Sequence, residues 1–122
     1  KMFVSFPNEK VFEWLKKDLY VYIQPSLQEG LPRSVIEAMS VGLPCIGSDV
    51  AGIPELLDSV WVFPRKKNKG KGIAELLLKI DKKNLEKQAI RNFKEAKKYD
   101  YDFLLEKRYE ILEKYKSFIL EE

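Results

Sequence analysis

Short apolar runs alternate with segments of helical periodicity over the first 80 residues of the chain. Four of these runs have the length and composition of strands: residues 2–6, 20–24, 43–48 and 60–63. The run at 43–48 is too apolar to leave one face in water, which is typical of a strand in a parallel sheet covered on both sides. The pattern therefore predicts an α/β fold with about four parallel strands and flanking helices.

Apolar residues at helical spacing predict a helix after each of the first three strands. Asn8 is a good N-cap for the first helix, and Pro32 and Gly42 suit the first turn and the C-terminal cap of the second. A turn at 51–54 leads into a short third helix. After the fourth strand, a basic loop over residues 65–72 precedes another helix. Its apolar stripe has the spacing i, i+3, i+4, i+7 and consists of Ile73, Leu76, Leu77 and Ile80.

The chain changes character from Asp81 onward, where Gly and Pro are absent and Lys and Glu are frequent. This composition predicts two long helices with a break near Tyr99-Asp100. Leu105, Leu112 and Ile119 recur every seven positions in the second helix. Such a helix needs a surface to pack on. Either the α/β part of the chain or a neighbouring domain could provide that surface.

Composition excludes several classes of function. The net charge of +3 is modest and does not indicate a nucleic-acid partner. The chain has no His and the single Cys45, which rules out a zinc site or a catalytic Ser-His or Cys-His pair within it. No apolar run approaches the roughly 18 residues of a membrane span. The lone cysteine and the absence of a signal-peptide pattern predict a cytoplasmic protein.

Two glutamates, Glu29 and Glu37, lie eight positions apart where the second strand leads into its helix. The turn between them falls at the C-terminal edge of the predicted sheet, where α/β proteins bind ligands. The first amides of the helix, at Arg33 and Ser34, can bind an anion, and carboxylates accept hydrogen bonds from hydroxyl groups. The arrangement suits a diphosphate flanked by sugar hydroxyls. For an arbitrary pair, the simpler interpretation is a loop acid and an exposed helix acid.

Both glutamates belong to a longer set of linked motifs. The set comprises Pro25-Ser26, Glu29-Gly30, Glu37-Ala38-Met39, Gly42-Leu43-Pro44 and Ala51-Gly52-Ile53-Pro54-Glu55. Over residues 20–64 it resembles the retaining glycosyltransferases of the GT-B fold in the large family often called GT4. The resemblance implies that residues 1–80 form the nucleotide-sugar-binding part of a Rossmann-like domain. Residues 81–122 would be C-terminal helices that pack on it, in one structural domain of a larger enzyme.

The resemblance implies a site for a nucleotide-sugar donor, bound as substrate, with neither a cofactor nor a metal. Glu29 is the candidate catalytic residue and would hold hydroxyls of the donor sugar. Glu37 would accept hydrogen bonds from the ribose hydroxyls of the nucleotide. The loop at Phe6 and Pro7 would line the pocket for the base of the nucleotide. The other implied donor-binding residues line the sugar or the diphosphate and are Gly30, Leu31, Pro32, Arg33 and Ser34.

The implied reaction is the transfer of a sugar, with retention, from a nucleoside diphosphate to a hydroxyl acceptor. Glycans, polysaccharides and lipid-linked molecules are the acceptors that the resemblance implies. Family members carry an upstream Arg and Lys at the diphosphate and an N-terminal acceptor domain, which this sequence lacks. The chain by itself is therefore expected to be inactive. The alternatives are a non-catalytic nucleotide-sugar-binding module and a structural module that docks through its C-terminal helices.

A lipid-linked acceptor would place the enzyme at the inner face of a membrane. The basic segment 65–71 could contact an anionic membrane surface there, with about 1 kcal/mol from each basic residue. A solvated loop is the simpler interpretation of so short a charge run.

Overall fold

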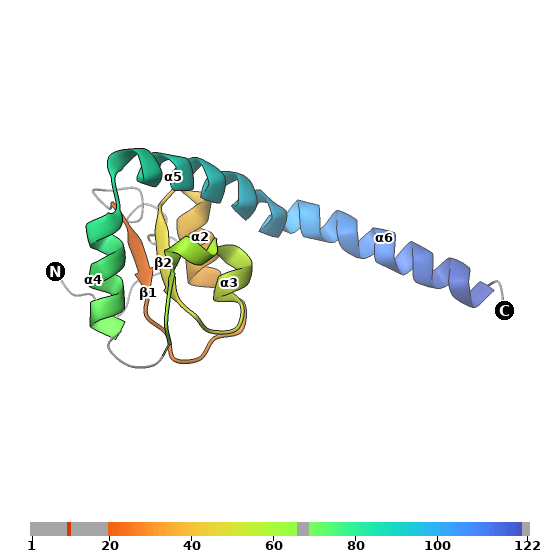
Figure 1. Cartoon of the computed structure of the whole chain (residues 1–122). Coiled ribbons are helices and arrows are strands. Elements are labelled where there is room, and N and C mark those ends of the chain that lie inside the picture. The colour runs from red at the N-terminus through yellow and green to blue at the C-terminus, as the bar shows by residue number, and fades with distance from the viewer. Residues whose placement is uncertain (1–9, 11–19, 66–68, 121–122) are drawn as a thin grey trace.

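Three short parallel strands form the sheet of the molecule (Figure 1). They are β1 (Tyr22–Gln24), β2 (Cys45–Ser48) and β3 (Val62–Phe63), and β2 lies between the other two. Tyr22 pairs with Cys45, and Gly47 pairs with Val62, both in parallel register. The predicted α/β class with a parallel sheet is thus confirmed.

The computed structural model describes Lys10 and two longer stretches, residues 20–65 and 69–120. Two predicted elements, the strand at 2–6 and the helix that follows Asn8, fall outside these residues except for Lys10, which is helical and exposed. The part of the chain that the structure describes therefore has three strands, where the sequence predicts about four.

Helices and two short 3₁₀ segments connect and follow the strands. They are α2 (Arg33–Ser40), α3 (Ile53–Leu56), η1 (Ser59–Trp61), α4 (Lys69–Lys79), α5 (Lys82–Ala96), η2 (Lys97–Tyr99) and α6 (Tyr101–Leu120). Helix α5 lies across the end of the sheet at which the strands begin, and the loops that follow β1 and β2 lie at the opposite end (Figure 1). A ligand at the carboxyl ends of the strands would meet these loops.

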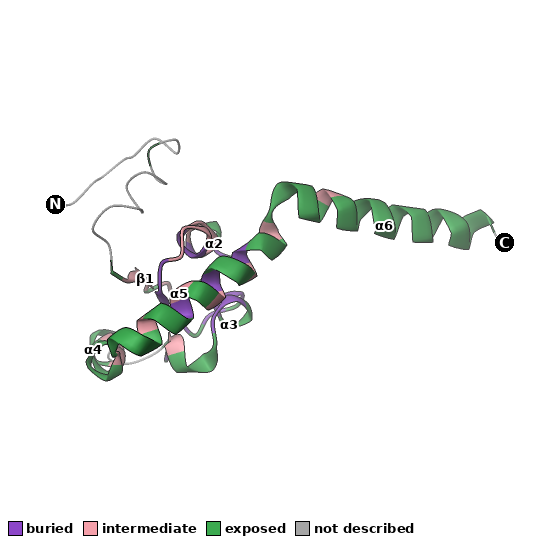
Figure 2. Cartoon of the chain, turned by 90° about the horizontal axis from the view of Figure 1, so that it is seen from above, coloured by how far each residue is buried: buried purple, intermediate pink, exposed green. Residues whose placement is uncertain are grey.

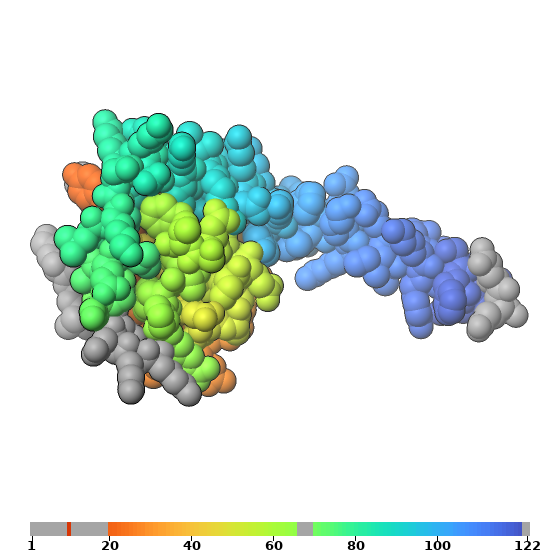
Figure 3. All heavy atoms as spheres, viewed as in Figure 1, coloured from red at the N-terminus to blue at the C-terminus, as the bar shows by residue number. Residues whose placement is uncertain are grey.

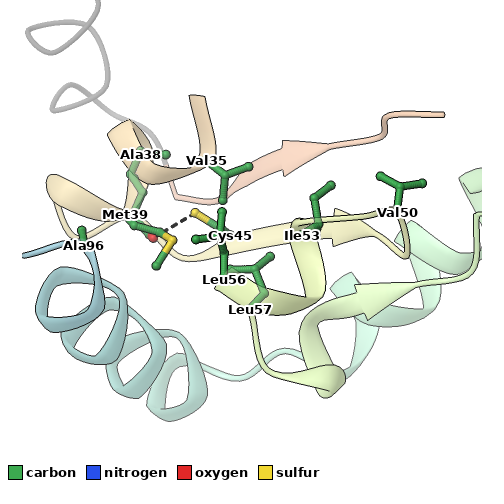
Figure 4. Close-up of a cluster of buried hydrophobic side chains, with 10 residues drawn as sticks. Val35, Ala38, Met39, Cys45, Val50, Ile53, Leu56, Leu57 and Ala96 are labelled. Atoms are coloured by element: carbon green, nitrogen blue, oxygen red, sulfur yellow. Dashed lines mark hydrogen bonds between the residues drawn. The ribbon is translucent and has the colours of Figure 1, made fainter. Parts of the chain in front are cut away.

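The hydrophobic core lies between α2, β2, α3 and the end of α5 (Figure 4). Its fully buried members include Val35, Ala38, Met39, Cys45 and Ile53. The sequence places Val35, Ile36 and Met39 on one apolar face of α2, and the structure buries Val35 and Met39 while leaving Ile36 half-buried. Burial raises the pKa of the Cys45 thiol to about 12. Cys45 is therefore an inert part of the core.

Polar side chains on the buried face of α5 hold this helix against β2. The Gln88 carboxamide accepts a hydrogen bond from the Cys45 N–H at 3.2 Å and donates one to the Cys45 carbonyl at 2.8 Å, as a neighbouring strand would. One turn later, Asn92 donates to the Leu43 carbonyl at 2.9 Å. Both side chains are buried. They satisfy backbone groups at the start of β2, because the short β3 pairs only with its end.

Helix α4 begins earlier than the sequence predicts. The expected basic loop reaches Gly72, whereas the structure starts the helix at Lys69 and includes both Gly70 and Gly72 in it. A Cβ on Gly72 would stand 3.2 Å from the Cβ of Phe63. The glycine therefore lets the first turn of the helix approach β3 closely, and this packing outweighs its low helix propensity.

Helix α6 extends away from the rest of the molecule (Figure 3) and is exposed along its length except at the half-buried Leu105 (Figure 2). The predicted break near Tyr99-Asp100 is confirmed, because Asp100 is extended and its side chain accepts a hydrogen bond from the Asp102 N–H at 3.0 Å. No residue of α6 is buried against the described part of the chain, and Ile111 and Phe118 are 65% and 64% exposed. The expected division of the domain at residue 80 stays a prediction.

Candidate functional site

The β1–α2 loop stands at the carboxyl end of β1 and leads directly into a helix without a side-chain cap. Pro32 is buried and extended, and its carbonyl accepts hydrogen bonds from the N–H groups of Val35 and Ile36 at 3.2 and 3.3 Å. Arg33 and Ser34 are the first two residues of α2. Their amides have no helical partner by geometry and point out of the positive end of the helix. They can therefore bind an anion.

Two loops meet at glycines beside this helix. The Gly52 N–H donates to the Gly30 carbonyl at 3.0 Å. A Cβ on Gly52 would stand 2.5 Å from that carbonyl oxygen, so a side chain at this position would push the loops apart. A Cβ on Gly30 would meet nothing within 4 Å. The Ala51-Gly52 motif thus has a packing role, while the space over Gly30 is open to a ligand.

Glu29 is held in place by two neighbours, one at the end of β1 and one in the same loop. The Gln24 Nε2 donates to Glu29 Oε1 at 2.8 Å, and the Ser26 hydroxyl donates to the same oxygen. Gln24 Nε2 also donates to Ser26 Oγ at 2.8 Å. Glu29 is half-buried by these contacts. It is therefore an oriented carboxylate and not a freely moving loop acid.

The same glutamine connects Glu29 to β1 and α2. Gln24 Oε1 accepts hydrogen bonds from the Tyr22 hydroxyl at 2.7 Å and from Ser34 Oγ at 3.2 Å. Burial raises the pKa of Tyr22; the Ser34 hydrogen bond opposes this rise, and the charges of Cys45, Glu37 and Glu29 add to it. Tyr22 therefore lies within electrostatic reach of both candidate glutamates.

Ser48 ties the loop to the neighbouring strand. It is fully buried at the end of β2, and its hydroxyl donates to the Ser26 carbonyl at 2.6 Å. Sequence reasoning did not single out Tyr22, Gln24 or Ser48. The sequence offers two signals for them. One is a polar residue at the end of an otherwise apolar strand, and the other is the alternation of strand side chains, which puts residues 22 and 24 on one face.

Glu37 faces a separate open groove of about 980 Å³ between α2 and the α5–α6 junction. Leu31 and Arg33 also line this groove, whereas Glu29 does not. The opposite wall carries aromatic and basic side chains, among them Phe93, Lys97, Tyr99, Tyr101 and Arg108. The predicted site residues thus fall into two groups. Glu29, Gly30 and Ser34 belong to the loop and its network, and Glu37 belongs to the groove.

Neither a metal-binding cluster nor a membrane-spanning helix occurs among the described residues. These residues contain no group of three or more His, Cys, Asp or Glu side chains that could hold a metal ion. Within the same part of the chain, no helix has both the length and the apolar character needed to cross a membrane.

Comparison with known proteins agrees with the motif pattern. A family model described as glycosyl transferases group 1 matches residues 3–81. The chain is 34% identical over 83 residues to the amylovoran biosynthesis glycosyltransferase AmsK of Erwinia amylovora. It is 30% identical over 95 residues to the putative colanic acid biosynthesis glycosyltransferase WcaL of Escherichia coli. These alignments cover 61% and 70% of this chain.

A third relative matches a shorter segment more strongly. This is the UDP-Gal:alpha-D-GlcNAc-diphosphoundecaprenol alpha-1,3-galactosyltransferase of Escherichia coli, which is 53% identical over 32 residues, or 26% of this chain and 8% of that protein. The alignments with AmsK and WcaL cover 20% and 23% of those proteins, so the chain spans about a fifth of the length of its curated relatives. The family model covers more than half of this chain, and the chain belongs to the group 1 glycosyltransferase family.

Proposed function

We propose that this chain is the donor-binding part of a retaining glycosyltransferase, which moves a sugar from a nucleoside diphosphate to a hydroxyl acceptor. The observation that carries the proposal is the oriented Glu29 carboxylate. Gln24 and Ser26 hold it at the carboxyl end of β1, next to the uncapped start of α2. Family membership supports a nucleotide-sugar ligand for this arrangement.

Each part of the loop suits one part of such a donor. Glu29 would accept hydrogen bonds from sugar hydroxyls, because an ionised carboxylate is an acceptor only. Gly30, Leu31 and Pro32 would line the sugar, and the amides of Arg33 and Ser34 would bind the diphosphate. Donors aimed at the leaving diphosphate stabilise the charge that develops as the sugar departs. These contacts would contribute to catalysis through positioning and leaving-group stabilisation.

Glu37 would accept hydrogen bonds from the ribose hydroxyls of the nucleotide. Its place on α2, after Arg33 on the same groove wall, supports this role. Glu37 follows Arg33 by four residues of α-helix, which corresponds to a rise of about 6 Å along the helix axis. The amides proposed to bind the diphosphate are thus separated from Glu37 by about the width of one ribose ring.

The acceptor is proposed to bind outside this chain, because the chain spans only about a fifth of its relatives. One relative is named as acting on a diphosphoundecaprenol-linked sugar. By analogy, a lipid-linked or polysaccharide acceptor is the first class to test for the whole enzyme, together with a place for it at the cytoplasmic face of a membrane.

Titration calorimetry on the 122-residue chain tests the donor site. UDP-galactose with UDP and GDP-mannose with GDP are suitable probe pairs, because each pair differs only by the sugar. Glu29→Gln should weaken binding of the sugar nucleotide about tenfold and leave binding of the free diphosphate unchanged. Glu37→Gln should weaken both, because both ligands contain the ribose.

Glu55→Gln is the matched control, since Glu55 is an exposed glutamate on α3. It should bind each probe as the wild-type chain does. If the wild-type chain binds no probe more tightly than buffer phosphate, the proposed donor site is wrong.

The exposed apolar residues of α6 favour one other candidate, a docking module without turnover. The two functions differ in their response to nucleotides. A docking module would show no shift of its melting temperature with any sugar nucleotide, whereas a donor-binding chain gains stability from its ligand.

A further inference from the structure

We infer that Gln24 is a positioning residue, which aims the Glu29 carboxylate at the donor sugar. The inference rests on the proposed function and adds a residue to it. Gln24 is the last residue of β1, and all of its side-chain hydrogen-bonding groups are engaged within the chain. It has no proposed contact with the ligand itself.

The orientation of the Gln24 carboxamide is determined by its partners. Two hydroxyl groups, from Tyr22 and Ser34, lie within hydrogen-bond distance of Oε1. The acceptor Glu29 lies against Nε2. A flipped carboxamide would place its oxygen against the carboxylate of Glu29, so only one orientation provides a donor for an acceptor-only partner.

This orientation divides the two oxygens of Glu29 between the protein and the ligand. Oε1 receives hydrogen bonds from both Gln24 and Ser26. Among the described residues, no side chain or backbone group donates to Oε2. A sugar hydroxyl would therefore find Oε2 available, and Gln24 would determine the direction in which that oxygen points.

The position of Gln24 predicts a selective effect. Its influence on the ligand passes through the Glu29 side chain, which is proposed to touch only the sugar. The diphosphate would instead meet backbone amides of α2, whose start depends on Pro32. Loss of the glutamine should therefore weaken the sugar contact and spare the diphosphate contact.

Calorimetry on the full chain with UDP-galactose against UDP, and GDP-mannose against GDP, tests this role. Gln24→Met keeps the length of the side chain and removes both hydrogen-bonding groups. It should reduce the preference for the sugar nucleotide over the free diphosphate about tenfold, which is the effect of losing one hydrogen bond to a charged group. The affinity for the free diphosphate itself should be unchanged. Gln28→Met is the matched control, because Gln28 is an exposed glutamine of the same loop.

A double-mutant cycle separates positioning from a general loss of structure. If Gln24 acts through Glu29, then Gln24→Met should have no further effect on sugar preference in a Glu29→Gln background. An additive effect of the two substitutions would contradict the inference. The melting temperature of each variant provides the check that it is folded.

A measurement without ligand covers the case in which Gln24→Met does not fold. In the wild-type chain, the side-chain NH₂ protons of Gln24 should exchange more slowly with water than those of Gln28. Glu29→Ala should shift the side-chain NH₂ resonances of Gln24 and leave those of Gln28 unchanged. Equal exchange at the two glutamines would overturn the inference.

The two proposals fail in different ways. A wild-type chain that shows no preference for any sugar nucleotide over its diphosphate contradicts the proposed sugar contact and this role together. A wild-type preference that Gln24→Met retains contradicts the role of Gln24 alone.

Discussion

The β1–α2 loop and helix α6 expose their side chains in opposite ways. In the loop, the polar groups of Ser26 and Glu29 are half-buried and hydrogen-bonded to each other and to Gln24 at the end of β1. On α6, large apolar groups such as Ile111 and Phe118 face water. The loop takes its partners from β1, α2 and β2, whereas the side-chain hydrogen bonds of α6 to other described residues join residues of the helix itself or its preceding turn.

The difference shows where the tertiary fold supplies stability. A polar network inside the molecule keeps its geometry because several elements hold it, and leaving one of its buried groups unpaired is costly. A helix of this length is marginal in water when it has only its own hydrogen bonds. The sheet region should thus be sensitive to single substitutions, and α6 should be tolerant of them.

The largest expected difference concerns apolar truncations. Met39→Ala, in the core, should lower the free energy of unfolding by about 3 kcal/mol, because it removes buried apolar volume and leaves a cavity. Phe118→Ala, on α6, should change it by less than about 0.5 kcal/mol. Urea unfolding of both variants measures the two values. Equal losses would mean that α6 is packed in solution and would remove the contrast.

A smaller loss of stability is expected at the contact where Gln88 of α5 takes the place of a strand beside β2. Gln88→Ala leaves the N–H and C=O groups of Cys45 without their partners and should lower the free energy of unfolding by about 2 kcal/mol. Lys87→Ala, at the exposed neighbouring position, is the control and should cost less than about 0.5 kcal/mol. A Gln88 variant as stable as its control would show that water forms the hydrogen bonds to the Cys45 N–H and C=O groups in its place.

The buried thiol should make stability fall in alkaline solution. The pKa of Cys45 is raised from 9.0 to about 12 in the folded chain, so the unfolded chain loses this proton first as the pH rises. Stability from this group is therefore complete below about pH 9 and declines above it, by about 1 kcal/mol between pH 8 and pH 10. Urea unfolding at the two pH values measures the decline. In Cys45→Ala, the decline of the free energy of unfolding between the two pH values should be smaller by about 1 kcal/mol. An unchanged decline would mean that other groups cause it.

The smallest expected effect is at the junction of the loop with β2. Ser48→Ala removes the hydrogen bond to the Ser26 carbonyl and should lower the free energy of unfolding by about 1 kcal/mol. Ser117→Ala, which removes a local side-chain bond to the Lys114 carbonyl on α6, should have an effect near zero. Thermal unfolding followed by circular dichroism compares them. If Ser117→Ala is the more damaging, the assignment of stability to the sheet region is wrong.

Local sequence signals predict much of the fold. Pro32 and Gly42 bracket α2 correctly, and the predicted break near Tyr99-Asp100 is present. Local signals place the start of α4 too late, because the reason for Gly72 in a helix is its approach to Phe63. That contact joins residues from different elements and has no local signal.

The candidate site divides in the same way. Glu29 and Glu37 stand out through their motif spacing, and their roles toward a donor stay predictions. The network around Glu29 could not be predicted, because no spacing rule brings Tyr22, Ser34 and Ser48 to one loop. Nor does the spacing show that Glu37 lines a groove that excludes Glu29.

The sequence by itself determined the α/β class, the family and the positions of the two glutamates. Each depends on residues that are close in sequence, where periodicity, turn residues and linked motifs carry the information. Only the tertiary structure decided which oxygen of Glu29 is engaged and what holds it. The parallel register of β1 and β2 brings Ser48 to the loop, and the packing of α2 brings Ser34 to Gln24. Hydrogen bonds are short and directional, so their partners are known only when the elements are in place.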